Sequence, residues 1–292
     1  MSFGSGLNPG SIAGLIIRRY TSEHGKQRGV SSQFRKVAQS EAASKHTEAH
    51  VSQGIEAIVL PLPYRMGSVN CYLVKTDTGH ILIDTGCSKR RAELERRLER
   101  SGCGCGSLTL ILLTHGDFDH AGNASYLREK FDTRIAMHRD DSGMVERGDL
   151  FCGRRKGNII IRKVAPVLFG FGRSERFSPD DCLDDGYDLS GYGLDGRILH
   201  IPGHSKGSVG VLTADGDLFC GDLFTNDDRP VLNSIMDDPA AANSSVERLG
   251  SLEVRTVYPG HGRAFAIEEF TVSSGQLETR RRCGLRMRGI PR

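Results

Sequence analysis

The most constraining feature of the sequence is an apolar run that leads directly into a group of potential metal ligands. Residues 108–113 read Leu-Thr-Leu-Ile-Leu-Leu, and residues 115–120 read His-Gly-Asp-Phe-Asp-His. A short run rich in leucine and isoleucine is typical of a buried β-strand. In an open α/β sheet, the loops at the carboxyl ends of the strands carry the chemistry. We therefore expect four ligand-type side chains at one edge of a sheet: His115, Asp117, Asp119 and His120.

Three further ligand-type residues each follow a glycine. Histidines occur in Pro-Gly-His204-Ser-Lys-Gly-Ser and in Pro-Gly-His261-Gly, and an aspartate ends the strand-like run Leu-Phe-Cys-Gly-Asp222. A single histidine after a glycine is more often a turn or core residue than a ligand. Imidazole and carboxylate groups are nevertheless the ligands that zinc accepts, and additional oxygen donors favour iron or manganese. Together with the first group, these residues are enough to hold two metal ions.

The order of these residues resembles that of the metallo-β-lactamase-fold hydrolase superfamily, in which H-x-[HDE]-x-D-H precedes a single His, a single Asp and a last His. Two other segments, 69–74 (Val-Asn-Cys-Tyr-Leu-Val) and 81–86 (Ile-Leu-Ile-Asp-Thr-Gly), resemble an early strand and the strand and turn beside the metals. The resemblance covers about residues 56–270. It departs from the commonest pattern at Asp117, where many members have His, and this leaves the identity of the metal open.

The resemblance implies an α/β fold, a four-layer αβ/βα sandwich with two metal ions at one edge between two sheets. It assigns the ligands in this order: His115, Asp117 and His204 to one ion, Asp119, His120 and His261 to the other, and Asp222 as the bridge. Zinc is the first expectation for both ions, with iron or manganese as alternatives. Two ions about 3.5 to 4 Å apart can share a water and lower its pKa toward about 7. Asp119 is then the expected catalytic proton shuttle, and Asp84 is expected to hydrogen-bond the metal loop.

Composition divides the chain into an acidic body and basic ends. The whole chain of 292 residues carries a net charge of +3, residues 1–55 hold seven Lys or Arg against three Glu, and residues 271–292 hold six Arg against one Glu. The segment 56–270 therefore carries about −6. We expect a disordered basic extension over 1–55, one folded domain over 56–270, and a basic tail over 271–292, because the ends lack apolar periodicity.

The least readable segment is 139–180, which is charged and rich in glycine. Long loops in compact domains are often functional, so this insertion is a candidate lid or substrate loop. A surface excursion with its own small apolar cluster explains it equally well. No general motif identifies the substrate-binding residues. Among the regular elements, we expect Ser88 to cap a helix that runs to about Arg100, and a further helix over 243–250.

The eight cysteines form no regular disulfide framework, which favours a reduced, cytoplasmic setting. The pair Cys103-Gly-Cys105 lacks the partner pair that a zinc site needs and is interpreted as a loop. The Arg- and Ser-rich, acid-poor N-terminus also fits an organellar transit peptide or a misassigned extension. We expect a small-molecule substrate and neither a nucleic-acid nor a membrane partner. The sequence does not predict the oligomeric state.

The most favoured function is hydrolysis of an ester, thioester or lactone of a small molecule by a dinuclear metal centre. The residues around His204 resemble the glyoxalase II-like branch of the superfamily, but only about 20 residues follow the last expected strand. The C-terminal glutathione-binding helical domain of that branch is therefore expected to be missing. Two alternatives remain: a persulfide dioxygenase-like or diiron redox protein, for which Asp117 would supply an oxygen ligand, and a nuclease that holds phosphates on its basic ends.

Removal of residues 1–53 should leave the fold intact, because this segment has no apolar periodicity and precedes the first family-like strand. A chain beginning near Val51 should melt at the same temperature as the full chain when both are followed by circular dichroism. A fall of several degrees would show that the segment packs on the domain.

Overall fold

The computed structural model describes residues 54–154 and 170–273. The expected N-terminal extension lies outside this range except for its last two residues, and so does the expected C-terminal tail from residue 274 onward. Part of the insertion that was expected to form a lid or loop, residues 155–169, is also outside it.

The first sheet contains six strands in chain order: β1 (Ile55–Pro61), β2 (Ser68–Thr76), β3 (Gly79–Ile83), β4 (Leu108–Leu112), β5 (Arg134–Met137) and β6 (Asp181–Cys182). The pairs β1–β2 and β2–β3 are antiparallel, and the pairs from β3 to β6 are parallel. Strand β4 is the apolar run of the sequence analysis, and it ends one residue earlier than expected. Its position between two parallel neighbours explains why its residues are almost continuously apolar.

The second sheet has the order β12 (Phe265–Ala266), β11 (Thr256–Gly262), β9 (Asp217–Asn226), β8 (Val209–Thr213) and β7 (Gly196–His200), with β10 (Val231–Leu232) paired to β9. Strands β9 and β11 are parallel, and their register shifts twice between Tyr258 and His261. Each of these two strands contains a candidate ligand: Asp222 lies within β9 and His261 within β11.

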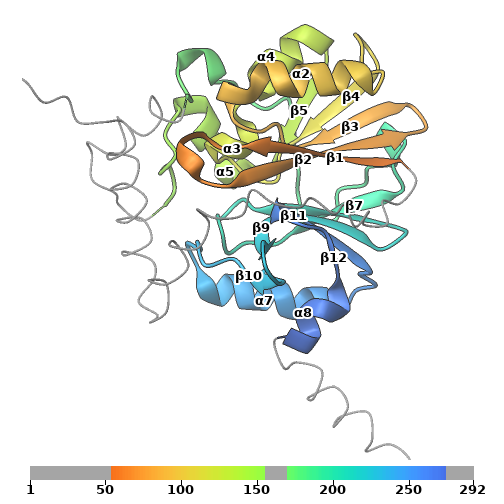
Figure 1. Ribbon diagram of the computed structural model, residues 1–292, viewed down its shortest axis with the longest axis vertical. Helices are drawn as coiled ribbons and strands as arrows, with labels where there is room; N and C mark the ends of the chain where they lie inside the picture. The colour runs from red at the N-terminus through yellow and green to blue at the C-terminus, as the bar shows by residue number, and fades with distance from the viewer. Residues whose placement is uncertain (1–53, 155–169, 274–292) are drawn as a thin grey trace, which may run out of the picture.

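Helices cover the outer face of each sheet, which gives four layers (Figure 1). Helices α2 (Arg91–Arg100) and α4 (Ala124–Phe131) lie over the first sheet, and α7 (Pro239–Leu249) and α8 (Ile267–Ser273) lie under the second. The expected αβ/βα sandwich is confirmed. Helix α7, with 11 residues, is the longest in the described ranges, and none of their helices is long and apolar enough to cross a membrane.

Three apolar cores separate these layers because strand residues alternate between the two faces of a sheet. In β3, Leu82 packs toward α2 and α4, whereas Ile81 and Ile83 pack toward the second sheet. Phe219 of β9 fills the space between the sheets from the other side, and Val246 of α7 packs in the third core. The ends of both sheets are thereby held in register around the candidate site.

Two predicted helix starts are wrong. Ser88 does not cap α2: residues Ser88–Arg90 form a 3₁₀ turn, and the Ser88 hydroxyl donates to the carbonyl of Gly170 instead. Helix α7 begins at Pro239 rather than near residue 243, because the Asp238 carboxylate accepts from the backbone N–H groups of Ala240 and Ala241. Proline at the first helical position suits this start, since it needs no N–H partner.

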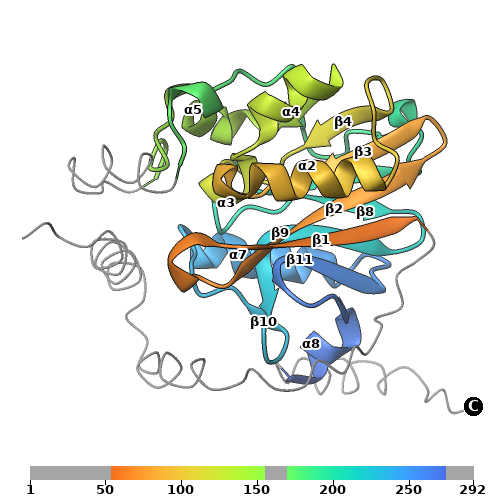
Figure 2. The ribbon, with the colours of Figure 1, turned by 45° about the horizontal axis from the view of Figure 1, so that its top comes forward.

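The segment 139–180 contains a helix that the sequence analysis missed. Helix α5 (Arg139–Arg147) starts at His138, whose ring nitrogen accepts from the N–H of Asp140. Met144 and Val145 are buried on its inner face, but a glycine and three acidic residues dilute the apolar pattern that would reveal it. Figures 1 and 2 place α5 at the same end of the molecule as α3 (Phe118–Ala121), which carries part of the metal loop.

Candidate dinuclear metal centre

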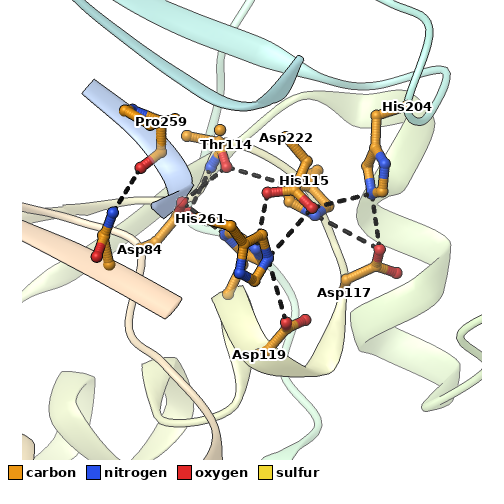
Figure 3. Close-up of polar contacts among 12 residues, drawn as sticks. Asp84, Thr114, His115, Asp117, Asp119, His204, Asp222, Pro259 and His261 are labelled. Carbon is orange, nitrogen blue, oxygen red and sulfur yellow. Dashed lines mark hydrogen bonds and ion pairs between the residues drawn. The ribbon is translucent and has the colours of Figure 1, made fainter. Parts of the chain in front are cut away.

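The seven candidate ligands lie together at the end of the sandwich where the two sheets meet. His115 and Asp117 stand in the loop after β4, Asp119 and His120 lie in α3, and His204 stands in the loop after β7. Asp222 and His261 come from the neighbouring parallel strands β9 and β11. Each sheet therefore contributes part of the cluster, and Figure 3 shows the side chains pointing toward one another.

The cluster divides into two groups of three residues whose ligand atoms lie within 4.8 Å of one another. One group is His115, Asp117 and His204, and the other is Asp119, His120 and His261. Asp222 lies between them: its Oδ1 is 3.3 Å from His120 Nε2, and its Oδ2 is 3.4 Å from His261 Nε2 and 3.9 Å from His204 Nε2. A third group of the same kind, His115, His120 and Asp222, connects the other two, and the ligand roles that the family resemblance implies stay a prediction.

All four histidines of the cluster direct Nε2 inward because Nδ1 is engaged elsewhere. His204 Nδ1 lies 2.7 Å from the carbonyl oxygen of Ile235, and His261 Nδ1 lies 2.6 Å from that of Ser68. A carbonyl only accepts, so both rings carry their proton on Nδ1. An imidazole in this tautomer presents a lone pair at Nε2, as a metal ligand requires.

Asp84 fixes the other two histidines, as the sequence analysis expects. Its Oδ2 accepts from His120 Nδ1 at 2.8 Å and from the Thr114 hydroxyl at 2.8 Å, and Oδ1 accepts from the Thr114 N–H. Since Thr114 Oγ1 gives its proton to Asp84, it accepts from His115 Nδ1 at 3.0 Å. Asp84 is buried and has φ of 60°, a left-handed conformation that is costly for a residue with a side chain.

Whether these residues fit metal ions is decided by the hydrogen bonding of the atoms that face the interior of the cluster. His115 Nε2, His120 Nε2 and Asp222 Oδ1 are buried and make no hydrogen bond within the described residues. Buried polar atoms without a hydrogen bond are rare and costly, because they have given up water without a replacement. Three such atoms converge here from three elements, and imidazole nitrogen with carboxylate oxygen is the donor set of a transition-metal site. The residues therefore fit a pair of metal ions.

Two glycines allow the strands of the second sheet to approach the cluster closely. Gly221 has φ of 49°, and a Cβ at this position would lie 2.6 Å from Thr114 Oγ1. A Cβ at Gly260 would collide with Asp222 Oδ1 and would lie 2.7 Å from the His120 ring. Any larger residue at these two positions would push the ligand strands away from the metal loop.

Charges in the cluster shift the pKa values of its members strongly. Burial opposes ionisation of Asp117 and Asp222, but neighbouring cations outweigh it and hold the pKa of each carboxyl well below its usual range. For Asp117 the main cation is Arg154, and for Asp222 it is His261. Burial lowers the pKa of His261, but Asp222 and then Asp119 raise it to about 9. In the metal-free protein, the His261 imidazole is therefore protonated, and its positive charge faces the neighbouring carboxylates.

Two polar residues near the cluster are functional candidates that the sequence analysis did not identify. Asp141 of α5 is buried, and its carboxylate accepts from Gly116 N at 3.2 Å, Ser205 Oγ at 2.6 Å and Gly207 N at 2.9 Å. It thus joins the His115 loop to the His204 loop. Arg154 forms a bidentate ion pair with Asp117. No motif reveals either residue, since both lie in the charged segment after β5.

A cavity of about 400 Å³ lies beside the His204 loop. Gly203 and Ser205, which flank His204, form part of its lining, together with Arg154 and Lys206. Its volume is within the range of small-molecule sites in proteins.

A separate group of His138, Asp140 and His200 also brings three ligand-type atoms within 4.8 Å of one another. The two imidazole rings are stacked, with centroids 4.3 Å apart and an interplanar angle of 5°. The lone pair of an imidazole nitrogen lies in the ring plane, so parallel stacked rings do not direct their lone pairs at one ion. His200 Nε2 is moreover bonded to the carbonyl of Lys206.

The chain belongs to the metallo-beta-lactamase superfamily, whose family model matches residues 64–261. Superfamily members bind metal ions, and most are metal-dependent hydrolases. The match includes all seven candidate ligands, although it does not test the role of any one of them.

Several relatives carry names that describe hydrolases. The probable metallo-hydrolase YqjP of Bacillus subtilis is 26% identical over 238 residues, which cover 72% of each chain. The acyl-coenzyme A thioesterase MBLAC2 of Bos taurus is 27% identical, over 73% of this chain and 81% of its own. The hydroxyacylglutathione hydrolase GloC of Haemophilus influenzae is 28% identical, over 56% of this chain and 70% of its own.

Solved structures with the same fold include TTHA1623 in a di-iron-bound form. It is 29% identical with a TM-score of 0.57, and the alignment covers 73% of this chain and 95% of that one. The BLEG-1 B3 metallo-beta-lactamase is 23% identical with a TM-score of 0.56, covers 74% of this chain and 97% of its own, and supports the fold alone.

Metal binding should strengthen as the pH rises toward about 9, because the ion must displace the proton from His261. The raised pKa means that this proton is present throughout the neutral range, so removing it costs less with each unit of rising pH. The apparent affinity should increase by up to about tenfold per pH unit for each proton displaced. Competition with a chelator at several pH values measures the apparent affinity. Calorimetry in buffers of different ionisation enthalpy measures the number of protons displaced. An affinity that is constant across the neutral range would contradict this expectation.

Replacing Asp141 should destabilise the metal-free protein more than replacing its exposed neighbour Asp140. The Asp141→Ala change leaves two backbone N–H groups and one hydroxyl without their buried acceptor, at a cost of about 2 to 4 kcal/mol. Urea unfolding of chelator-treated protein measures the difference without a contribution from bound metal. Asp140→Ala is the matched control. Equal unfolding midpoints for the two variants would show that the Asp141 bonds add nothing to stability.

Proposed function

We propose that this protein is a dinuclear metal-dependent hydrolase that cleaves an ester, thioester or lactone of a small molecule. The observation that carries the proposal is the convergence of four Nε2 atoms and three carboxylates in two ligand sets joined by Asp222. His115, Asp117 and His204 would hold one ion, and Asp119, His120 and His261 the other. Zinc is the expected metal, with iron or manganese as alternatives.

When bound, the two ions supply Lewis acidity that lowers the pKa of water toward neutrality and stabilises negative charge on the reacting acyl group. The chain's own residues orient the side chains that would bind the ions. Asp84 and the carbonyls of Ser68 and Ile235 keep the imidazoles in the tautomer that leaves Nε2 available. Asp119 is the proposed proton shuttle. It is almost fully buried, its Oδ2 lies 3.6 Å from His261 Nε2, and in the proposed role its other oxygen would hold the proton.

The relatives support an acyl substrate. MBLAC2 is named as a thioesterase of acyl-coenzyme A, and GloC is named as a hydrolase of hydroxyacylglutathione. The cavity of about 400 Å³ beside the His204 loop has room for a small molecule. The net charge of about −6 for residues 56–270 weighs against a nuclease, because a nucleic-acid backbone would be repelled by this part of the chain.

A redox function is the second candidate, and two observations favour it. Asp117 adds an oxygen ligand where many superfamily members have histidine, and oxygen ligands suit iron. The related TTHA1623 has been solved in a di-iron-bound form. A persulfide dioxygenase-like activity would consume oxygen, whereas hydrolysis would not.

A substrate panel together with metal analysis tests the proposal. The purified protein should contain close to two transition-metal ions per chain, and should hydrolyse at least one of a set of thioesters, lactones and carboxylic esters. The His120→Ala change removes a ligand of the second ion and should lower kcat/KM by at least about a thousandfold. Asp222→Ala should also reduce the metal content, because the bridging carboxylate is lost.

Cys105→Ser is the matched control, since Cys105 is exposed in the turn before β4 and lies outside the cluster. Its activity and metal content should equal those of the wild type. Oxygen uptake with a persulfide and no hydrolysis of any acyl substrate would favour the redox candidate. Cleavage of a phosphodiester alone would favour the nuclease, and a metal-free protein with full activity would refute the dinuclear centre.

A further inference from the structure

Arg154 is a buried arginine that contacts the candidate ligand Asp117 directly. Its Nη1 lies 2.7 Å from Asp117 Oδ1, and its Nη2 lies 3.1 Å from Asp117 Oδ2. The side chain is only 6% exposed, so this ion pair is not the solvated surface type that contributes little. A cation next to a cation-binding site is unfavourable by itself, and its presence therefore calls for an explanation.

The two oxygens of Asp117 have different surroundings. Oδ2 lies 2.9 Å from His204 Nε2 and 3.5 Å from His115 Nε2, so it faces the other two ligands of the first ion. Oδ1 makes the shortest contact with Arg154. The guanidinium thus donates to both oxygens, most closely to Oδ1, and only Oδ2 also faces the centre of the site. A flat, forked donor suits this task, because it fixes the plane of the carboxylate as well as its position.

Arg154 also forms an ion pair with a second carboxylate, that of Asp237. Its Nε lies 2.9 Å from Asp237 Oδ2, and the N–H of Asp237 donates to the carbonyl of His204 at 3.3 Å. The guanidinium therefore links the metal loop to the segment between β10 and α7, which is itself hydrogen-bonded to the His204 loop. Its orientation is set by both carboxylates, so Asp117 cannot rotate without breaking this arrangement.

We propose that Arg154 is a positioning residue that makes Asp117 a one-oxygen, charge-compensated ligand, so that the pair takes the place of a neutral histidine. Aspartate alone would add a negative charge to the first ligand set and could offer both oxygens to the ion. Arg154 offsets the charge and holds Oδ1 at the shorter distance, so Oδ2 is the oxygen directed at the ion. This inference rests on the proposed dinuclear centre, and it explains how aspartate is accommodated at a position where many superfamily members have histidine.

The first test replaces Asp117 by histidine, either alone or together with a replacement of its partner Arg154. Asp117→His removes the carboxylate that shields the first ion from the Arg154 charge, and should weaken binding of that ion at least tenfold. Asp117→His/Arg154→Met removes the surplus charge and should recover binding to within about threefold of the wild type. Competition with a chelator for Zn²⁺ measures both, and circular-dichroism melting confirms that each variant is folded. A double variant that binds no better than Asp117→His would overturn the proposal.

The second test uses the visible spectrum of the Co²⁺-substituted protein. Arg154→Met frees Oδ1, so Asp117 can bind through both oxygens, and the absorption bands of one Co²⁺ should weaken as its coordination number rises. Arg154→Lys keeps the charge without the fork and should give an intermediate spectrum. Arg248→Met is the control, because Arg248 forms a bidentate pair with Asp185 on the surface, away from the cluster. An Arg154→Met spectrum identical to the wild type would count against the proposal.

Failure of the dinuclear centre would be recognised separately. Asp117→Ala should bind only one ion tightly if Asp117 is a ligand. Two tightly bound ions in Asp117→Ala would refute the proposed ligand set itself. One bound ion in that variant, with no effect of Arg154→Met on the spectrum and no recovery in the double variant, would refute only the role of Arg154.

Discussion

Four imidazoles and three carboxylates can be buried side by side only if their outward-facing atoms have fixed partners, and this requirement organises the whole site. Each of the four Nδ1 atoms is bonded to a different acceptor: the carbonyls of Ser68 and Ile235, the Thr114 hydroxyl and the Asp84 carboxylate. Ser68 lies in β2, Asp84 and Thr114 lie in the loops after β3 and β4, and Ile235 lies in the segment between β10 and α7. The tautomers are therefore set by the fold, and the buried Nε2 atoms of His115 and His120 make no hydrogen bond within the described residues.

The same requirement explains why the two sheets must meet closely at this end. Asn70 of β2 donates to the carbonyls of Pro259 and Gly262 on β11 at 2.9 and 2.7 Å, on either side of His261. Tyr72 donates to the carbonyl of Pro259 at 2.6 Å. These bonds cross from one sheet to the other and fix the strand that carries His261. The sequence motif around residues 69–74 thus has a physical role: it ties the second sheet to the first beside the metal loop.

The sequence was sufficient to predict the layer order and which seven ligand-type side chains lie together, because these residues occur next to apolar runs in a recognisable order. It was insufficient where polar contacts decide the local structure. Ser88 has the side chain of a helix cap, but a distant carbonyl, that of Gly170, accepts its hydroxyl. Asp141 and Arg154 lie in a charged segment with no periodic signal, and their importance comes from partners 25 to 66 residues away. Such long-range pairings cannot be inferred from local spacing.

Asp117 illustrates the difference between predicting a residue and predicting its chemistry. From the sequence, aspartate in place of histidine indicates a harder, more negative ligand set and leaves the metal open. In the structure the carboxylate lies against a guanidinium 37 residues further along the chain, so the charge of the site differs little from that of a site with histidine. A substitution at a metal ligand must therefore be interpreted together with the charge that faces it. The pair can preserve the electrostatics of the site even though its ligand chemistry has changed from nitrogen to oxygen.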